Sequence, residues 1–255
     1  MSTRPLDDSV VLVTGATSGI GLATAEAFAA KGSKVVLSGR RTELGEPAAQ
    51  AIRHGGGDAL FVQTDMTDDA QVDRLVSQTV DHYGRLDIAF NNAGIEGDPL
   101  TPLHESSLDS YARVFDTNVR AVLYSMMREV PAMLASGGGA IVNNASIAGL
   151  IGFPGASIYC ASKHAVIGLT KSAALEYAAA GIRVNAVAPA VIKTGMFERF
   201  ASQTEGLLDH AVTLHPIGRF GESPEVAQAV VWLSSPENSF TTGVTIPIDG
   251  GFTAQ

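Results

Sequence analysis

The sequence predicts an α/β fold: one doubly wound parallel β-sheet of about seven strands, with helices on both faces. Apolar runs of strand length alternate with helical patterns along the whole chain, which is typical of a parallel sheet covered by crossover helices. The first run, Val10–Val13, is apolar throughout, as in a strand buried on both faces. A Gly-rich turn, Thr14–Gly21, follows it and opens a helical pattern, as in a βαβ unit.

The later predicted strands are short apolar runs, mostly bounded by Gly, Asp, Asn or Pro. They span Lys34–Ser38, Ala59–Val62, Leu86–Phe90, Ala140–Asn143, Ile182–Val187 and Thr245–Ile248. The predicted helices fill the intervals with apolar residues at a helical period. They span Leu22–Ala30, Glu43–His54, Asp69–Tyr83, Leu108–Leu134, Ser157–Ala180 and Ser223–Leu233. Thr67 or Asp68 is expected to cap the third helix, and Pro224 suits the first turn of the last one.

Composition bounds the class of protein. The 255 residues are 45% hydrophobic and 17% charged, which gives ample apolar side chain for one core, and no linker or repeat divides them. A net charge of −9 argues against nucleic acid and anionic membranes as partners. One Cys cannot form an internal disulfide, and Met1–Asp8 contains no apolar segment of a signal peptide. A soluble cytoplasmic protein is the default expectation.

Tyr159 and Lys163 form a candidate catalytic pair. Four residues apart in a predicted helix, they lie one above the other on one face. An ammonium beside a phenol favours the phenolate, so Lys163 is expected to lower the pKa of Tyr159 from its usual value of about 10. Ser146, after a predicted strand, is expected to direct its hydroxyl to the same point. Chance alone gives roughly 0.1 such Tyr–Lys spacings in this chain, so the spacing by itself is weak evidence for a catalytic pair. The alternative is an exposed Tyr–Lys pair on the surface of a helix.

The turn after the first strand is a candidate phosphate site. Gly15, Gly19 and Gly21 permit a tight turn and let backbone N–H groups approach a pyrophosphate at the helix N-terminus. A plain tight turn is the alternative, and it is disfavoured because the glycines stand between a strand and a helix.

These motifs resemble those of the short-chain dehydrogenase/reductases, whose fingerprint Thr-Gly-x-x-x-Gly-x-Gly matches Thr14–Gly21. The resemblance runs through nearly the whole chain and implies one Rossmann-type domain, 1–255, with a substrate-binding loop at about 189–215. It implies a carbonyl reductase or alcohol dehydrogenase that interconverts a ketone and a secondary alcohol by hydride transfer. Ser146 and Tyr159 would bond the carbonyl oxygen, and Tyr159 would donate its proton. Lys163 would bond the nicotinamide ribose, and Asn118 would hold a water.

The resemblance also implies a set of cofactor contacts in the segments that follow the strands. They are Gly15, Thr17, Ser18, Gly19, Ile20, Gly21, Arg40, Arg41, Asp65, Met66, Asn92, Ala93, Gly94, Tyr159, Lys163, Pro189, Ala190, Ile192 and Thr194. Asp65 is expected at the adenine. Two departures from the family pattern are Ala190, where Gly is usual, and Asn144–Ala145, where another Ser often precedes Ser146. A slight restriction of the backbone beside the nicotinamide is expected at Ala190.

The end of the second strand favours NADP(H), with NAD(H) as second choice. Gly39 stands where dinucleotide folds place the carboxylate that binds the ribose 2′-OH, and Arg40 offers a guanidinium to a 2′-phosphate. The alternative is that Arg40 and Arg41 are a solvated loop pair. Ser18 stands where many NADP-binding relatives carry a basic residue.

The expected substrate is a small uncharged ketone or alcohol, apolar or cyclic, because no Lys or Arg cluster marks the cleft. The resemblance implies that its contacts come from Glu96, Ile147, Phe153, Met196, Phe197 and Phe200. A 3-oxoacyl-carrier-protein reductase is the rival enzyme, although it requires a basic landing patch. A catalytically silent NADP-binding regulatory protein is the alternative of another class. The six His form no ligand pattern, so no metal is expected.

A homotetramer with two-fold symmetry is expected. The resemblance implies pairing through the two long helices, Leu108–Leu134 and Ser157–Ala180, and a second contact near the C-terminal strand.

Overall fold

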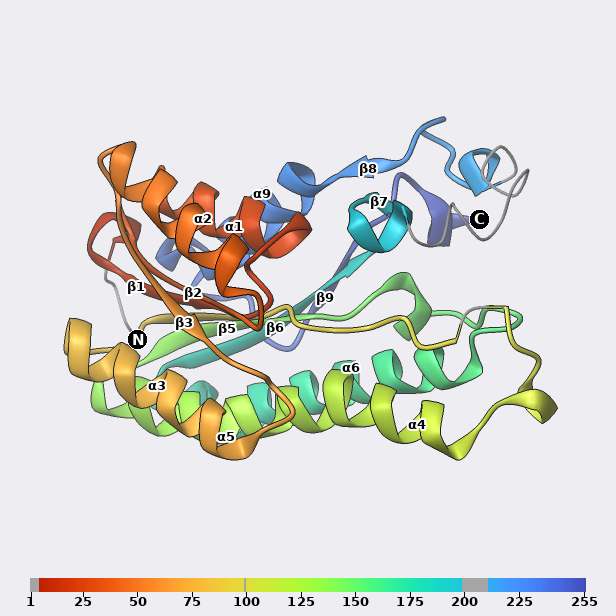
Figure 1. The fold of residues 1–255 in the computed structure, drawn as a ribbon, viewed down its shortest axis with the longest axis horizontal. Helices are drawn as coiled ribbons and strands as arrows, with labels where there is room; N and C mark the ends of the chain where they lie inside the picture. The colour runs from red at the N-terminus through yellow and green to blue at the C-terminus, as the bar shows by residue number, and fades with distance from the viewer. Residues whose placement is uncertain (1–4, 99, 199–210) are drawn as a thin grey trace.

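The computed structural model describes residues 5–98, 100–198 and 211–255 (Figure 1). Its main sheet has seven parallel strands in the order β3-β2-β1-β4-β5-β6-β9, which confirms the predicted fold. The strands are β1 (Val10–Val13), β2 (Lys34–Gly39), β3 (Asp58–Gln63), β4 (Ile88–Asn91), β5 (Gly139–Asn144), β6 (Ile182–Pro189) and β9 (Thr245–Ile248). A small second sheet pairs β7 (Ile192–Lys193) with β8 (Gly221–Glu222), which the sequence did not predict.

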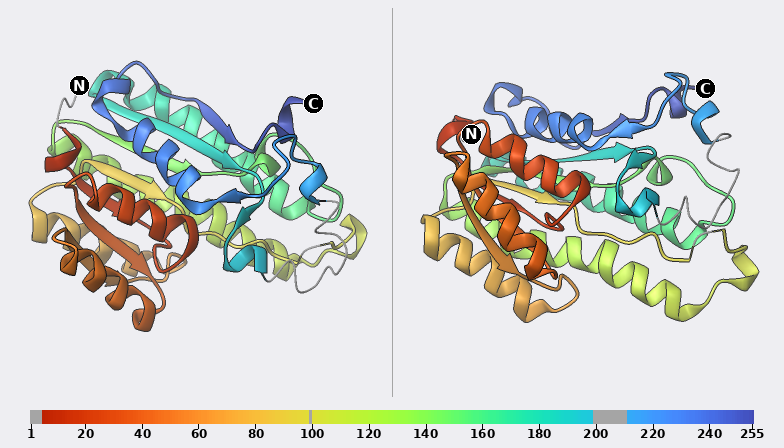
Figure 2. Two further views of the ribbon diagram at one scale, coloured as in Figure 1. Left: turned by 90° about the horizontal axis from the view of Figure 1, so that it is seen from above. Right: turned by 45° about the horizontal axis from the view of Figure 1, so that its top comes forward.

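Helices cover both faces of the sheet (Figures 1 and 2). One layer holds α1 (Gly19–Ala29), α2 (Thr42–His54) and α9 (Ser223–Ser234); the other holds α3 (Asp69–Tyr83), α4 (Leu108–Phe115), α5 (Ala121–Ala135) and α6 (Ser157–Tyr177). Short 3₁₀ segments span Leu6–Asp8, Leu103–Glu105, Ile147–Gly149, Ala178–Ala180, Pro236–Asn238 and Phe252–Ala254. Asp68 caps α3 as expected, since its side chain accepts the N–H groups of Ala70 and Gln71.

The predicted helix Leu108–Leu134 is not a continuous α-helix. A π-helical turn, Asp116–Arg120, separates α4 from α5. The prediction missed it because such a turn keeps the helix direction and leaves the apolar pattern almost unchanged. The turn holds Asn118, whose side chain is fully buried. Single π turns within helices often occur at functional sites, and this one contains a predicted site residue.

The sheet topology brings the predicted site segments to one edge. β1 lies between β2 and β4, so the strand order reverses direction there, and ligands of such sheets bind outside the carboxyl ends of the strands. The Gly-rich turn follows β1, and the run Asn91–Gly94 begins at the last residue of β4. Ser146 follows β5, and Ala190 follows β6. Segments far apart in the sequence therefore meet at this edge.

Candidate active site

The turn after β1 is closed to side chains. Gly15 and Gly19 have φ of +63° and +57°, a region that favours glycine. A methyl group at Gly21 would lie 2.4 Å from the carbonyl oxygen of Gly15, closer than atoms can approach. The first N–H groups of α1 have no acceptor within the helix. This turn therefore fits a pyrophosphate, which needs close backbone approach and N–H donors.

Two side chains tie this turn to the end of β4. The Asn92 amide donates to the carbonyl oxygens of Thr14 and Gly15, at 2.9 and 3.2 Å. The Thr14 hydroxyl accepts the N–H groups of Asn92 and Ala93, at 2.9 and 3.1 Å. The sequence shows Thr14 in the Gly-rich fingerprint but predicts no role for it. It positions the turn, because it joins the two segments that follow β1 and β4.

Arg41, rather than Arg40, lies over the Gly-rich turn. Its guanidinium donates to the hydroxyls of Thr17 and Ser18, at 2.9 and 3.0 Å. Arg40 is exposed, and its carbonyl oxygen accepts from Gln63. A methyl group at Gly39 would lie 2.6 Å from the Thr17 side chain, so a carboxylate there would require Thr17 to move. Both arginines stand at the rim where a ribose 2′ substituent is expected.

The other predicted cofactor residues line the same edge. Asp65 accepts the N–H and hydroxyl of Thr67, and Met66 is buried. A methyl group at Gly19 would lie 3.1 Å from Thr194, which places Thr194 against the turn. Ile20 is half-buried and Ile192 is buried.

Ala190 does not have the positive φ that would require Gly at its position. Leu100 is the one residue other than glycine with positive φ in the described part of the chain. The Ala190 N–H donates to the carbonyl oxygen of Ile248, and Pro189 accepts the Ser146 hydroxyl at 3.4 Å.

Ser146, Tyr159 and Lys163 converge beside this edge. The Ser146 side chain hydrogen-bonds to Tyr159. The Lys163 ammonium lies 5.6 Å from the centroid of the Tyr159 ring and donates to the carbonyl oxygen of Asn144 at 2.8 Å. The Asn144 side chain in turn donates to the side-chain oxygen of Asn92 at 2.9 Å. Asn144, which the sequence presented only as a departure from the family pattern, therefore connects Lys163 to the cofactor turn.

The expected lowering of the Tyr159 pKa is wrong for this structure. Burial raises the pKa of Tyr159 to about 12, the hydrogen bond with Ser146 opposes that rise, and the charge of Glu96 adds to it. Burial also lowers the pKa of Lys163 to about 8. The expectation failed because the spacing shows only that the phenol and the ammonium are near each other. Desolvation disfavours the charged form of each group, and its extent depends on the fold.

Asn118 holds the start of the segment after Gly94. Its side chain accepts the N–H of Ile95 and donates to the carbonyl oxygen of Ile95, both at 2.9 Å. It also donates to Ser162, whose hydroxyl donates to the Tyr159 carbonyl oxygen. A methyl group at Gly94 would lie 3.2 Å from the Asn118 oxygen and 3.6 Å from the Lys163 nitrogen. The four predicted catalytic residues therefore form one contiguous group with Gly94.

The predicted substrate residues are only partly brought together. Phe153 packs against Phe252, and Phe197 against Phe220, with ring centroids 5.7 and 5.0 Å apart. His215 lies between Phe252 and Phe220, so these five rings form one aromatic cluster. Glu96 lines a small cavity together with Tyr159. Ile147 is buried and Met196 is half-buried, whereas Phe200 lies outside the described residues.

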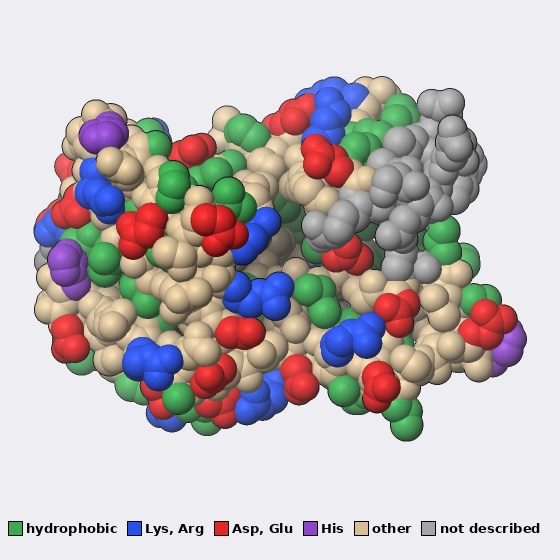
Figure 3. All heavy atoms as spheres, in the orientation of Figure 1, with side chains coloured by type: hydrophobic (Ala, Val, Ile, Leu, Met, Phe, Trp, Pro, Cys, Tyr) green, Lys and Arg blue, Asp and Glu red, His purple; other side chains and the backbone are tan. Residues whose placement is uncertain are grey.

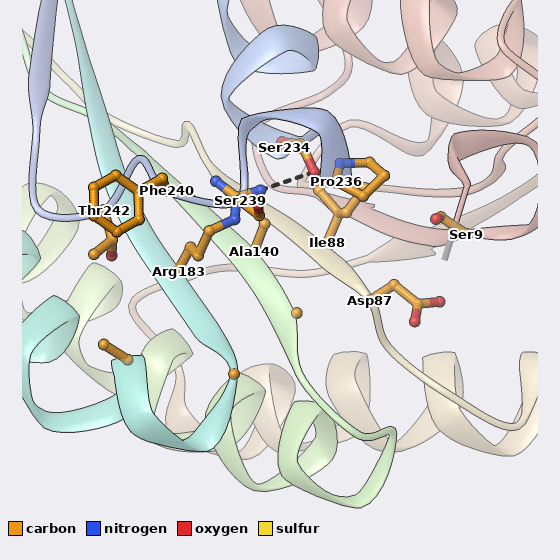
Figure 4. A pocket seen from close by; sticks show the side chains of 13 residues that line it. Ser9, Asp87, Ile88, Ala140, Arg183, Ser234, Pro236, Ser239, Phe240 and Thr242 are labelled. Atoms are coloured by element: carbon orange, nitrogen blue, oxygen red, sulfur yellow. Dashed lines mark hydrogen bonds between the residues drawn. The ribbon is translucent and has the colours of Figure 1, made fainter. Parts of the chain in front are cut away.

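A cavity of about 300 Å³ lies away from this site, at the opposite end of the strands (Figure 4). Its lining includes Ile88, Gly139 and Arg183, which stand at or near the starts of β4, β5 and β6. The Arg183 guanidinium donates to four backbone carbonyl oxygens, of Leu233, Ser234, Ser235 and Thr241. Its visible role is to hold the end of α9.

Two kinds of site are missing from the part of the chain that the structure describes. It contains no group of three or more His, Cys, Asp or Glu side chains placed to hold a metal ion. None of its helices is long and apolar enough to cross a membrane.

Comparison with known proteins gives full-length matches. A sequence model of the family described as enoyl-(acyl carrier protein) reductase matches residues 15–253. Cyclohexanol dehydrogenase of Acinetobacter sp. (strain SE19) is 45% identical over 253 residues, covering 99% of this chain and 98% of that protein. The crystal structure of levodione reductase superposes with a TM-score of 0.93 and 37% identity, covering 98% of this chain and 99% of that one.

A further solved structure contains a dinucleotide. It is a candidate NAD(P)-dependent gluconate 5-dehydrogenase from Beutenbergia cavernae with NADP bound at low occupancy, 33% identical with a TM-score of 0.92. It covers 99% of this chain and 100% of that one. The Gly-rich turn, the Ser–Tyr–Lys group and these full-length matches all indicate the same family. The chain belongs to the short-chain dehydrogenase/reductase family of alcohol and ketone oxidoreductases.

Proposed function

We propose that this enzyme interconverts a small uncharged cyclic ketone and its secondary alcohol, with NADP(H) preferred over NAD(H). The observation that carries the reaction is the convergence of Ser146, Tyr159 and Lys163 beside a turn that fits a pyrophosphate. The nicotinamide, when bound, supplies or accepts the hydride.

The protein's part is to hold the carbonyl oxygen and to move one proton. Ser146 and Tyr159 present two hydroxyls to one point, and both can donate to a carbonyl oxygen. With its pKa raised to about 12, Tyr159 is protonated at neutral pH and is ready to act as the acid in reduction. Lys163, fixed by the Asn144 carbonyl, places its charge beside the phenol and favours the phenolate that remains.

An uncharged substrate suits the described surroundings of Tyr159. Glu96 and Asp98 line the small cavity beside Tyr159, and the charge of Glu96 acts on the phenol, so these carboxylates would oppose an anionic substrate there. The similarity to a cyclohexanol dehydrogenase supports a ring-shaped alcohol.

The test of this function is a panel of substrates with both cofactors. We expect cyclohexanol and related cyclic secondary alcohols to be oxidised with NADP⁺, and the matching ketones to be reduced with NADPH. Carboxylate and phosphate analogues of similar size should have a much lower kcat/KM. If no ketone or alcohol turns over while NADPH still binds, the protein is the silent cofactor-binding alternative.

A 3-oxoacyl-carrier-protein reductase is the rival that the panel must also cover. Carrier proteins are acidic and need a basic surface. The face shown in Figure 3 is hollowed near its centre, and Lys and Arg side chains are interspersed with Asp and Glu over it, with no broad basic patch. Several arginines, among them Arg113 and Arg120, pair with aspartates. A higher kcat/KM for an acyl carrier protein thioester than for cyclic ketones would favour the rival.

The homotetramer predicted from the sequence stays a proposal, and exposed apolar side chains support it. Leu108 on α4 and Leu175 on α6 are 84% and 85% exposed, and Phe240 before β9 is fully exposed. Burying such side chains between subunits is favourable, and two-fold assemblies are the most common solution. Light scattering should give four times the mass of the chain at micromolar concentration.

Variants that replace an exposed leucine by lysine test which surface forms the contacts between subunits. Leu175→Lys should reduce the mass to a dimer or monomer. Leu44→Lys, on α2 in the opposite layer, is the matched control and should leave the mass unchanged. A fully active wild-type monomer would contradict the prediction. A cytoplasmic location is part of the same proposal, and it suits the buried free thiol of Cys160.

A further inference from the structure

A carboxyl group is buried in the core beneath the sheet. Glu129 of α5 has no exposed surface, and its Oε2 accepts from the Asn91 amide nitrogen at 3.0 Å. Its Oε1 has no hydrogen-bond partner among the described residues, and the same holds for Asn91 Oδ1 and Ser125 Oγ. Ser125 precedes Glu129 by one helical turn, so both side chains lie on one face of α5. The buried carboxyl group thus has one oxygen without a partner, and Asn91, which bonds its other oxygen, and Ser125 on the same helix face each have one as well.

This carboxyl group ends a chain of buried hydrogen bonds across four elements. Asn91 also donates to Asn143 at 3.1 Å, and these two residues are neighbours in the pairing of β4 with β5. Asn143 donates to Thr170 of α6 at 3.0 Å, and the Thr170 hydroxyl donates to the carbonyl oxygen of Val166. All of these side chains are buried. The chain fixes the ends of β4 and β5 against α5 and α6.

Among the described residues, no cation acts on the Glu129 carboxyl, whose pKa is shifted only by burial and by the hydrogen bond from Asn91. Asp69 and Asp73 of α3 pair at the surface with Arg120 and Arg128. Lys163 of α6 is committed to the Asn144 carbonyl, and Lys171 and Glu176 are exposed. Asp87, directly before β4, pairs with Arg85, and Arg183 of β6 binds carbonyl groups. An ionised Glu129 would thus be a buried charge with one hydrogen bond, which is costly. Burial raises its pKa to about 7.

The residues that directly follow Asn91 and Asn143 in the chain belong to the active site. Successive side chains of a strand face opposite sides, so Asn92 and Asn144 point away from Glu129. Asn92 bonds the Gly-rich turn, and the Asn144 carbonyl accepts the Lys163 ammonium. The two are also bonded to each other. A displacement of the strand ends would therefore reach both the cofactor turn and Lys163.

We propose that Glu129 is a positioning residue that acts as a neutral carboxylic acid. Its proton removes the buried charge and adds an O–H donor among acceptors that lack one. In this state it fixes the carboxyl ends of β4 and β5 beneath the cofactor turn and Lys163. Ionisation of Glu129 loosens these strand ends, weakening both the fold and cofactor binding. This inference goes beyond the proposed reaction and does not depend on the identity of the substrate.

The direction of the pH dependence follows from the raised pKa. Unfolded, the carboxyl titrates near its ordinary value of 4.5; folded, near 7. The stabilising contribution of the proton is therefore complete below the unfolded pKa and is lost as pH rises through the folded one. Within this window the unfolding equilibrium constant rises by up to about tenfold per pH unit, since unfolding releases about one proton.

The test compares wild type, Glu129→Gln and Glu129→Leu from pH 4.5 to 8.5 at one protein concentration. Urea unfolding reports stability, and NADPH fluorescence reports the dissociation constant. Gln has the same size and cannot ionise. From low to high pH, the ratio of the wild-type unfolding constant to that of Glu129→Gln should rise. This ratio should level off above about pH 7.5. The NADPH dissociation constant of wild type should rise severalfold against the Gln variant in the same window. Glu129→Leu should bind NADPH more weakly at every pH.

The outcomes separate positioning from simple packing. A pH-dependent stability ratio with a constant ratio of dissociation constants would overturn the positioning role. Glu176→Gln, an exposed glutamate on α6, is the matched control and should behave as wild type. If the Glu129 variants do not fold, NMR of wild type labelled at the glutamate carboxyl carbon shows whether the Glu129 carboxyl group is protonated. One glutamate should then titrate near 7, and titration of all glutamates below about 5.5 would overturn the proposal.

Discussion

Tyr159→Phe should lower kcat for ketone reduction by about 10²- to 10⁴-fold, the usual contribution of a positioned general acid. Phe keeps the ring over which the Lys163 ammonium lies and deletes only the hydroxyl that hydrogen-bonds with Ser146. The fold and the cofactor turn do not depend on that hydroxyl, so NADPH binding and thermal stability should change little. Steady-state kinetics together with a binding measurement separate the two effects.

A second tyrosine on the same helix provides the control for this variant. Tyr177 is the last residue of α6, about five turns after Tyr159, so Tyr177→Phe should leave kcat within about twofold of wild type. Near-full turnover by purified Tyr159→Phe would remove Tyr159 from the mechanism. A loss in both variants would point to damage to α6 rather than to a missing proton donor.

The sequence was sufficient for the fold because its signals are local and repeat. Each buried strand is an apolar run, and the helical segments between the strands place apolar residues at a helical period. The αL glycine Gly181 ends the helical stretch after Ser157, as predicted from its type. The π turn at Asp116–Arg120 was missed since one wider turn alters hydrogen bonding without changing which residues are apolar. The two-residue strands β7 and β8 are too short to leave any pattern.

The site was predicted as a set of residues but not as an environment. Motif spacing places Ser146, Tyr159 and Lys163 together, yet only the fold shows how deeply they are buried, and burial reverses the expected shift of the Tyr159 pKa. Glu129 illustrates the same limit. An acidic residue in a helix is expected to face water. The residues around Glu129 in the sequence do not indicate that it lies against the asparagines of β4 and β5. Thr14 and Asn144 likewise gain their roles from partners distant along the chain.

Arg40→Asp should shift the enzyme from NADPH towards NADH. The substitution replaces attraction for the 2′-phosphate by repulsion, and a charge-assisted contact contributes about 1–3 kcal/mol, or about 5- to 150-fold in kcat/KM. NADH lacks the phosphate, so its kcat/KM should change far less. The ratio of the two values, measured at one low salt concentration because exposed charges are screened, reports the effect directly.

The structure adds Arg41 to this prediction. Because its guanidinium already lies on Thr17 and Ser18, Arg41→Ala should lower the NADPH/NADH ratio as well, and the double variant Arg40→Asp with Arg41→Ala should lower it further. Arg74→Ala, an exposed arginine on α3, is the matched control and should leave the ratio unchanged. If the ratio is the same in wild type and in all three variants at the rim, the enzyme does not select NADP(H) through these arginines. If only the Arg41 variants change it, the phosphate lies over the Gly-rich turn and Arg40 is a solvated neighbour.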